Sequence, residues 1–224
     1  MKIALIGYGK MGHIIERIAL ERGHDVVCKI DKDNPEDFNS ADFCTADVAI
    51  EFTTPQTAVA NIRRAWTDGL PVVCGTTGWT EVLPELKKEL ARNGNALFWT
   101  SNFSIGVNLF FELNRQLSHL LQPYPQYQPS ITEIHHVHKL DAPSGTAISL
   151  AQDIQFPTID IESIREGEVP GTHIVRYESI VDSIEIKHEA KNREGFALGA
   201  VIAAEFIKDR QGFYTMQDLM KIER

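Results

Sequence analysis

One stretch of the sequence, EIHHVHKLDAPSGTA at 133–147, concentrates side chains that can move protons or bind an anion. Histidine titrates near neutral pH, and lysine can donate a proton or pair with a negative charge. This density of ionisable groups indicates a function for His135, His136 and Lys139, whereas His138 is expected to be structural. The stretch therefore predicts proton chemistry beside a bound anion.

The residues just after this cluster predict the anion site itself. Ser144 can cap a helix over Gly145–Ile154, because a serine oxygen accepts a hydrogen bond from a backbone amide of the first turn. The free amides of that turn, with the hydroxyl of Thr146, would bind a carboxylate.

A metal site is the alternative use of clustered histidines. In a strand over Ser130–His138, His135 would share a face with Glu133, while His136 and His138 would face the other way. Zinc needs three or four converging ligands, and adjacent strand residues diverge. We therefore expect no metal ion.

A glycine-rich motif near the start, GYGKMG at 7–12, predicts a dinucleotide site. Gly7 permits a tight turn, Gly9 lets the backbone approach a pyrophosphate, and Gly12 lets the following helix pack closely. The helix start would present free amides and a positive dipole end to the phosphates. A glycine-rich turn without a ligand is the alternative, and the motif's place between a strand and a helix favours the dinucleotide.

The acidic residue that closes the next strand, Asp31, lies near the roughly 20-residue spacing expected of a ribose-binding carboxylate. Asp31 could accept hydrogen bonds from both ribose hydroxyls and repel a 2′-phosphate, which favours NADH. Lys32 could instead turn toward a 2′-phosphate, so NADPH remains open. A solvated turn is the alternative interpretation of Asp31.

Small and polar residues follow three later strands: Thr53-Thr54-Pro55, Gly75-Thr76-Thr77-Gly78 and Thr100-Ser101-Asn102-Phe103. Ligands of parallel sheets bind at the carboxyl ends of strands, so these segments are expected near the nicotinamide ribose and amide. An ordinary turn is the alternative for Gly75–Gly78. Cys74 is expected to be inert packing rather than a nucleophile.

The elements that must position these residues alternate along the first hundred positions. Apolar runs predict strands and amphipathic stretches predict helices; the strands are Lys2–Ile6, Asp25–Asp31, Asp47–Phe52, Pro71–Cys74 and Ala96–Trp99, and the helices Met11–Arg22, Gln56–Thr67 and Glu81–Arg92. This alternation predicts an α/β fold with a doubly wound parallel sheet.

The second half follows a different pattern. Ser104–Gln122 predicts a helix capped by Ser104, with a core-facing stripe of Leu109, Phe110, Leu113, Leu117 and Leu120. Alternating segments then predict a mixed or antiparallel sheet: Ser130–His138, Thr172–Tyr177 and Ser183–His188. Arg193–Arg210 predicts a long helix that returns to the first domain.

Composition excludes several classes of protein. Among 224 residues, 31 acidic side chains outnumber 22 basic ones, which argues against nucleic acid as the main partner. No apolar run approaches the roughly 18 residues of a membrane span, and we expect no export signal. The three cysteines form no CxxC pair and are expected to be reduced thiols of a cytoplasmic protein.

The 15-residue stretch at 133–147 resembles the signature of the 4-hydroxy-tetrahydrodipicolinate reductase (dihydrodipicolinate reductase) family of bacterial lysine and diaminopimelate biosynthesis. The likeness covers nearly the whole chain, through GYGKMG, EFTTP, CGTTG, SNFSIGVN, GTHIV and HEAKNREGFALGA. It implies a Rossmann-like dinucleotide-binding domain over 1–103 and 193–224. It also implies an α+β domain over 104–192 that binds substrate and builds a homotetramer.

The resemblance further implies the reaction, in which NAD(P)H reduces 4-hydroxy-tetrahydrodipicolinate, with loss of water, to tetrahydrodipicolinate. His135 falls on the family's proton donor/acceptor, Lys139 on its second proton donor, and His136, Gly145 and Thr146 on substrate contacts. With the strand ends, the candidate cofactor-binding residues are Gly7, Tyr8, Gly9, Lys10, Met11, Gly12, Asp31, Lys32, Phe52, Thr53, Gly75, Thr76, Thr77, Thr100, Ser101, Asn102 and Phe103.

This assignment agrees with the residue chemistry. A dicarboxylate needs two anion contacts: the helix start at Ser144 can hold one and the His/Lys cluster the other. A proton must follow the hydride, and either His135 or Lys139 could give it.

The sequence departs from the family pattern in a tighter glycine loop, in Glu51 where Asp is usual, in Thr100-Ser101 where Ala-Pro is usual, and in its short length. Two alternative functions stay open at this point. One is a non-catalytic dinucleotide-sensing module; the other is a different NAD(P)-dependent dehydrogenase of a small dicarboxylate or amino acid.

Overall fold

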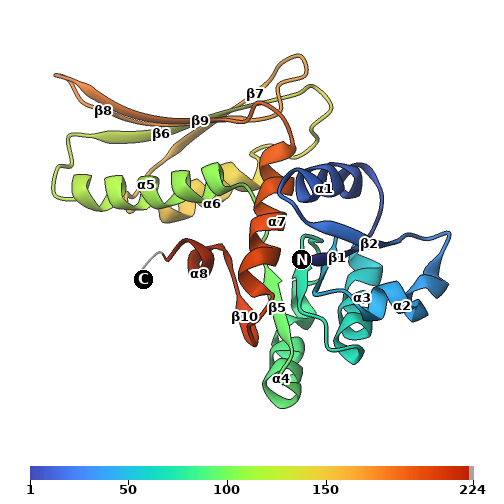
Figure 1. Ribbon diagram of the computed structural model, residues 1–224. Coiled ribbons are helices and arrows are strands. Elements are labelled where there is room, and N and C mark those ends of the chain that lie inside the picture. Colours follow the sequence, from blue (N-terminus) through green and yellow to red (C-terminus); the bar gives the residue numbers. More distant parts are fainter. Residues whose placement is uncertain (222–224) are drawn as a thin grey trace. The chain divides into compact units, whose positions relative to one another are not determined.

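The apolar runs of the first hundred residues form most of a six-stranded parallel sheet in the computed structural model, which describes residues 1–221 (Figure 1). The strand order is β10-β5-β4-β3-β1-β2. The strands are β1 (Lys2–Ile6), β2 (Asp25–Ile30), β3 (Val48–Glu51), β4 (Val72–Cys74), β5 (Ala96–Trp99) and β10 (Gly212–Tyr214). The predicted parallel sheet is confirmed; β10 was missed because three half-buried residues show no periodicity.

Helices cover both faces of this sheet. One face packs against α1 (Lys10–Glu21) and α7 (Glu194–Ile207), and the other against α3 (Pro55–Thr67) and α4 (Leu83–Asn93). Along β1 the side chains alternate between the two cores, with Ile3 and Leu5 facing one and Ala4 and Ile6 the other. Shorter elements complete the set: η1 (Pro35–Asn39), α2 (Ala41–Cys44), η2 (Thr80–Val82) and α8 (Met216–Met220).

The chain divides into two units, Met1–Ile105 together with the chain from Glu194 on, and Gly106–Arg193. The helix α7 thus joins the first unit from far along the sequence, and its buried alanines lie in the same core as Ile3 and Leu5. Residues 222–224, the end of the predicted first domain, lie outside the described residues. Among residues 1–221, no helix combines the length and apolar character that crossing a bilayer requires.

The second unit is a mixed four-stranded sheet with helices packed on one face. The strand order is β7-β6-β8-β9, with β7 parallel to β6 and the other pairs antiparallel. The elements are α5 (Ile105–Leu121), β6 (Gln128–His135), α6 (Gly145–Asp153), β7 (Asp160–Arg165), β8 (Thr172–Glu178) and β9 (Ser183–Glu189). The predicted mixed sheet is confirmed, while β7 was not predicted because its acidic, half-buried sequence DIESIR resembles a loop.

The apolar stripe predicted for α5 is confirmed for Phe110, which is buried, and for Leu117, which packs against the core, but it is wrong for the other three leucines. Leu109, Leu113 and Leu120 are 49%, 54% and 67% exposed. The buried side chains are Val107, Phe110, Asn114, Ser118 and Leu121. Each of the two polar residues on this face makes a hydrogen bond: Asn114 Nδ2 donates to the Leu150 carbonyl (3.0 Å), and Ser118 Oγ accepts from the Gln155 amide (2.8 Å).

The predicted strand over Ser130–His138 also ends too late. β6 stops at His135, so His136 and His138 lie in a loop rather than on the opposite strand face. The turn is held by backbone bonds, because the Lys139 amide donates to the His136 carbonyl (3.1 Å) and the Val137 amide to the Gly167 carbonyl (3.1 Å).

Candidate active site

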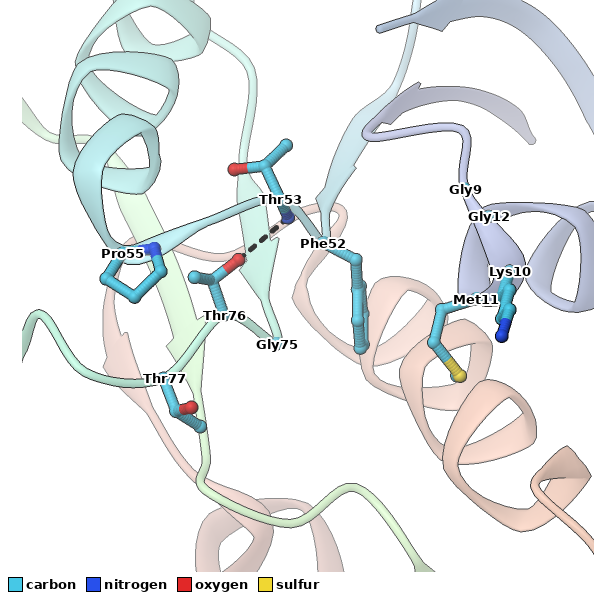
Figure 2. Close-up of a pocket in the computed structure, with 10 residues that line it drawn as sticks. All are labelled: Gly9, Lys10, Met11, Gly12, Phe52, Thr53, Pro55, Gly75, Thr76 and Thr77. Atoms are coloured by element: carbon cyan, nitrogen blue, oxygen red, sulfur yellow. Dashed lines mark hydrogen bonds between the residues drawn. The ribbon is translucent and has the colours of Figure 1, made fainter. Parts of the chain in front are cut away.

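Two adjoining cavities open at the carboxyl ends of β1, β3 and β4 in the first unit. One, of about 360 Å³, is lined by ten residues (Figure 2): Gly9, Lys10, Met11, Gly12, Phe52, Thr53, Pro55, Gly75, Thr76 and Thr77. The other, of about 430 Å³, shares Gly9, Phe52 and Thr53 with it and extends along Gly7, Asp31, Lys32, Pro35 and Phe38. Twelve of the predicted cofactor residues thus line one connected region: Gly7, Gly9, Lys10, Met11, Gly12, Asp31, Lys32, Phe52, Thr53, Gly75, Thr76 and Thr77.

The glycine loop has the geometry of a phosphate cradle. Gly7 has φ +95°, and a Cβ there would stand 2.0 Å from the Phe52 carbonyl oxygen, so only glycine fits. A Cβ at Gly9 would meet nothing within 4 Å, so the backbone at Gly9 faces open space. The start of α1 has no side-chain cap within the described chain, which leaves its first amides available to an anion. These residues fit a dinucleotide.

Tyr8 lies outside the lining of both cavities. Its hydroxyl donates to the Glu16 carboxylate on α1, and Lys29 Nζ of β2 lies 5.0 Å from its ring centre. Glu16 and Lys29 form an ion pair. The side chain of Tyr8 therefore connects the glycine loop to the neighbouring helix and strand.

The end of β2 places Asp31 and Lys32 side by side in the larger cavity. Asp31 Oδ1 accepts from the Lys32 amide (2.8 Å), and the Asp31 amide donates to Asn34 Oδ1 (2.8 Å). This tight turn fixes the Asp31 carboxylate and leaves Lys32 exposed. The two side chains that could distinguish a ribose with a free 2′-hydroxyl from one with a 2′-phosphate are therefore adjacent.

The ends of β3 and β4 are joined by polar contacts. The Thr53 amide donates to Thr76 Oγ1 (2.8 Å; Figure 2). Beneath them lies fully buried Glu51, which accepts from the Thr53 hydroxyl and from Cys74 Sγ (3.0 Å). Burial, reinforced by the Glu51 charge, raises the pKa of the Cys74 thiol well above its usual value, so Cys74 stays protonated and is not a nucleophile.

Four predicted cofactor residues, Thr100 to Phe103, are not among those that line these two cavities. Thr100 Oγ1 accepts from the Asn102 amide (3.2 Å), and Phe103 is a core residue whose ring centre lies 5.8 Å from that of Phe98. Ser101 is exposed.

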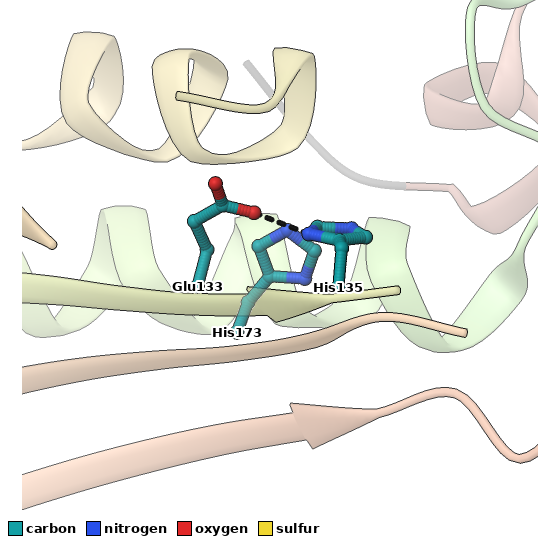
Figure 3. A group of neighbouring side chains, drawn as sticks. All are labelled: Glu133, His135 and His173. Atoms are coloured by element: carbon teal, nitrogen blue, oxygen red, sulfur yellow. Dashed lines mark ion pairs between the residues drawn. The ribbon is translucent and has the colours of Figure 1, made fainter. Parts of the chain in front are cut away.

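A buried cluster of ionisable side chains occupies the inner face of the second sheet (Figure 3). Glu133 and His135 lie two residues apart on β6, and His173 faces them from β8. His135 Nδ1 and Glu133 Oε2 form an ion pair, and the His135 and His173 ring centres are 5.1 Å apart. Burial lowers the pKa of His135; Glu133 opposes this shift, whereas Lys139 and Arg165 add to it.

Arg165, at the end of β7, completes this cluster. Its Nη2 donates to Glu133 Oε1 (2.8 Å). Burial opposes the charge on Glu133, but hydrogen bonds from Arg165 and Ser163 and the nearby positive charges hold its pKa below the usual value. Glu133 is therefore an anion with cationic or donor partners on both oxygens.

The start of α6 is linked to the same cluster. Ser144 Oγ accepts from the Ala147 amide (3.2 Å), which confirms the predicted cap, and lies 3.1 Å from His173 Nε2. Burial, with the charge of His135, lowers the pKa of His173 to about 4, so this ring is neutral near pH 7. A Cβ on Gly145 would meet nothing within 4 Å, and Thr146 is half-buried beside it.

Lys139 lies in the loop between β6 and α6, where its Nζ pairs with Asp141 Oδ1 (2.7 Å). His136 is half-buried in the same loop, with its ring centre 6.0 Å from that of His138. His138 is exposed and pairs with Glu168 (3.2 Å), so it contributes to the surface rather than the cluster.

Glu133, His135 and His173 also have the composition of a metal site, since one ligand atom from each lies within 4.8 Å of the others. Alternation along one strand does not predict this convergence, because His173 comes from the neighbouring strand β8. The Arg165 guanidinium on Glu133 disfavours a second cation there. The absence of a metal ion stays a prediction.

Sequence reasoning missed Arg165 and His173 as members of the cluster. Only the strand register, which pairs His135 with Arg165 and Glu133 with His173, brings them together. Glu133 had a usable signal, because it stands two residues before His135 and therefore shares its strand face.

Comparison with known proteins gives a consistent family. Residues 1–103 match the profile described as "Dihydrodipicolinate reductase, N-terminus", and residues 106–220 match "Dihydrodipicolinate reductase, C-terminus". A 4-hydroxy-tetrahydrodipicolinate reductase of Christiangramia forsetii is 47% identical, with 98% of each chain covered. One of Thermosipho africanus is 37% identical over 99% of this chain and 98% of its own.

A solved structure shares the fold. The dipicolinate-bound dihydrodipicolinate reductase from Paenisporosarcina sp. TG-14 superposes with a TM-score of 0.77 at 22% identity, covering 96% of this chain and 97% of that one.

Proposed function

Because the chain belongs to the dihydrodipicolinate reductase family and reduces 4-hydroxy-tetrahydrodipicolinate in lysine and diaminopimelate biosynthesis, we propose that its two units divide this reaction between them. The first unit, with boundaries near 1–103 and 193–224, binds NAD(P)H. The second, near 104–192, binds the dicarboxylate and handles protons.

The cavities of the first unit hold the cofactor in this proposal. The amides after Gly9 bind the pyrophosphate, Asp31 binds the adenosine ribose, and Thr53, Thr76 and Thr77 face the rest of the dinucleotide. NAD(P)H, when bound, supplies the hydride. The carboxylate of Asp31 favours NADH, and the neighbouring Lys32 makes NADPH usable. Thr100 to Phe103 remain candidates for cofactor contact because they directly follow the carboxyl end of β5.

The catalytic groups in this proposal are His135 and Lys139, and the observation that carries it is the buried His135–Glu133 ion pair. An imidazole oriented by a carboxylate on Nδ1 offers Nε2 to the substrate for proton transfer. Lys139, half-buried and positively charged, can supply a second proton or neutralise a carboxylate.

The substrate's carboxylates bind His136 and the start of α6 in this proposal. Ser144 keeps the first turn in place, while Gly145 and Thr146 present an amide and a hydroxyl. The Paenisporosarcina enzyme was solved with dipicolinate bound, and a related planar dicarboxylate is the ligand that we propose for this chain.

Self-association into a homotetramer and a cytoplasmic location are also part of the proposal. The core of the second unit lies on one face of its sheet. Ile134, Ile164 and Ile174 alternate along their strands with residues that face this core, so they lie on the opposite face. With exposed leucines on α5, the second unit has apolar surface available for further copies. All three cysteines are free thiols in the described chain, which suits a reducing compartment.

The test of the substrate site is Thr146→Val, assayed by NADH oxidation with freshly generated 4-hydroxy-tetrahydrodipicolinate and by inhibition with dipicolinate. Loss of a hydrogen bond to a carboxylate should raise both KM and the inhibition constant by about tenfold or more. Thr67→Val, an exposed residue at the end of α3 in the first unit, is the matched control. Unaltered constants for Thr146→Val would place the anion site elsewhere.

A further inference from the structure

One guanidinium contacts the surroundings of both proposed proton-handling groups. Arg165 Nη2 donates to Glu133 Oε1 (2.8 Å) and to the Asp141 carbonyl (2.6 Å). Its Nε donates to the Lys139 carbonyl (3.4 Å), and its Nη1 donates to the Ile164 carbonyl (2.8 Å). Arg165 therefore fastens the backbone on both sides of the Lys139–Asp141 turn to the sheet.

The Arg165 guanidinium also influences His135 indirectly, because both side chains pair with the Glu133 carboxylate. Glu133 is fully buried, with Arg165 on one oxygen and His135 Nδ1 on the other. A carboxylate accepts only, so Nδ1 carries the proton and the neutral ring has its free lone pair on Nε2. The tautomer of His135 and the position of Lys139 thus depend on a single ion pair.

We propose that Glu133 and Arg165 form a positioning pair for the reductase, in which Glu133 fixes the tautomer of His135 and Arg165 fixes the loop that carries Lys139. This inference rests on the proposed roles of His135 and Lys139. Neither Glu133 nor Arg165 needs to touch the substrate, since each acts through the group that it holds.

The two members of the pair should have different signatures. Glu133 acts by charge and by accepting from Nδ1, so its loss changes the proton affinity of His135. Arg165 acts mainly through its fork of donors, which a lysine cannot reproduce although it keeps the charge. The predicted effects of Glu133→Gln and Arg165→Lys are therefore separable.

The direction of the pH effect follows from the groups that face His135. These are Glu133 on β6, which raises its pKa, and Arg165 on β7, His173 on β8 and Lys139 on the loop, which are cationic or titrate to cations. His188 on β9 pairs with His173, and the buried face of α5 carries no titratable side chain. Removing the Glu133 charge should lower the pKa of His135. If activity needs protonated His135, the variant should then lose activity at a lower pH than the wild type as the pH rises.

The experiment compares kcat, KM and pH–rate profiles of the full-length variants. Glu133→Gln should lower kcat by about tenfold to a hundredfold, less than the 10²–10⁴ range for a lost general acid, and move the alkaline limb of the profile to lower pH. Arg165→Lys should lower kcat by about tenfold and leave that limb near its wild-type position. NADH affinity should not change in either variant.

Matched controls come from an exposed ion pair on β8, Arg176 with Glu178. Arg176→Lys and Glu178→Gln make the same chemical changes and should leave kcat and the profile as in the wild type. If His135→Ala lowers kcat while Glu133→Gln and Arg165→Lys match these controls, the positioning pair is wrong and the proposed function stands. If His135→Ala leaves kcat unchanged, the proposed catalytic role of His135 is wrong, and the positioning pair loses the role on which it rests.

A measurement on the unmodified enzyme covers the case in which Glu133→Gln does not fold. The protein has eight histidines, and their ring nitrogens can be labelled with ¹⁵N and assigned by comparison with His135→Ala. Long-range ¹H–¹⁵N spectra above the pKa of His135 should show its proton on Nδ1. A neutral His135 protonated on Nε2 would overturn the proposal without any variant of Glu133.

Discussion

Carboxylates in this chain take three roles according to what surrounds them. Glu133 is buried against a guanidinium and an imidazole, which keeps it charged. Glu51 is equally buried but accepts from a hydroxyl and a thiol, and so ties the ends of β3 and β4 together. Asp31 lies in the larger cavity at a tight turn, free to accept from a ligand. Burial and partners, rather than residue type, decide the role of each.

The role proposed for Asp31 predicts a selective loss of cofactor affinity. Asp31→Ala should weaken NADH, which loses the ribose hydrogen bonds, more than NADPH, whose 2′-phosphate is relieved of a repulsion. Fluorescence titration of both nucleotides measures the two dissociation constants. Asp33→Ala, in the same turn, is the control. Equal losses for the two nucleotides would remove the carboxylate from the ribose.

The residues that sequence reasoning found are those with a local signal. GYGKMG, Asp31 and the Ser144 cap each follow from spacing within one turn or one strand–helix junction, and the structure brings the first two to one cavity region and caps α6 with Ser144. Arg165 and His173 carry no such signal, because their role depends on which strands pair and in which register. Tyr8 lies outside the lining of both cavities, because motif membership does not specify side-chain direction, and its contact with the cofactor stays a prediction.

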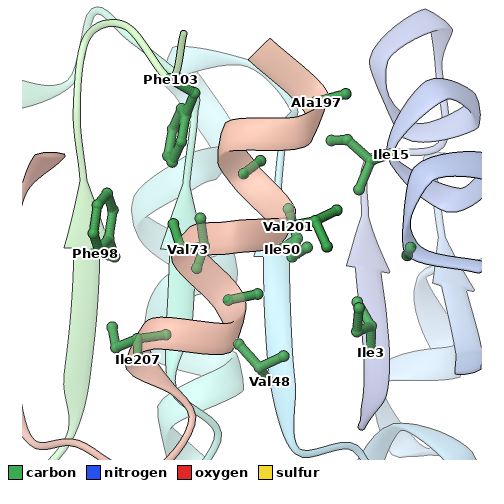
Figure 4. Packing of buried hydrophobic residues seen from close by; sticks show 14 of the residues in the cluster. Ile3, Ile15, Val48, Ile50, Val73, Phe98, Phe103, Ala197, Val201 and Ile207 are labelled. Atoms are coloured by element: carbon green, nitrogen blue, oxygen red, sulfur yellow. The ribbon is translucent and has the colours of Figure 1, made fainter. Parts of the chain in front are cut away.

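At the scale of elements, the buried positions of α7 explain how a distant helix joins the first sheet. Figure 4 shows Ala197, Val201 and Ile207 of this helix facing Ile15 and the strand residues Val48, Ile50 and Val73. Small residues let the helix approach closely, and a Cβ at Gly199 would stand only 1.8 Å from the Phe103 carbonyl oxygen. In α5, by contrast, hydrophobic periodicity was right for Phe110 but not for Leu109, Leu113 and Leu120, because the polar residues Asn114 and Ser118 take buried positions.

Gly199→Ala should destabilise the first unit by about 1–3 kcal/mol, the cost of overpacking, despite the higher helix propensity of alanine. Gly195→Ala in the same helix meets only an ordinary contact at 3.7 Å and should be neutral or slightly stabilising. All three tryptophans, Trp66, Trp79 and Trp99, lie in the first unit, so fluorescence during denaturant unfolding reports on it. Equal midpoints for the two variants would contradict the close packing.

At the scale of the whole molecule, the proposed homotetramer predicts a sedimenting mass four times that of the chain at micromolar concentration. Ile174→Glu, on the sheet face opposite the helices, should dissociate the assembly because it places a charge in an apolar contact. Leu20→Glu, which makes a similar apolar-to-acidic change at an exposed residue of α1 in the first unit, is the control. A monomeric wild-type protein would contradict the proposal.

The central claim is that the second unit supplies the proton through His135 while the first holds the reductant. The most direct measurement is steady-state NADH oxidation by His135→Ala with freshly generated 4-hydroxy-tetrahydrodipicolinate, alongside NADH binding. We predict that kcat falls by about 10²–10⁴-fold, as for a lost general acid, with the NADH dissociation constant unchanged. A kcat equal to that of the wild type would contradict the claim.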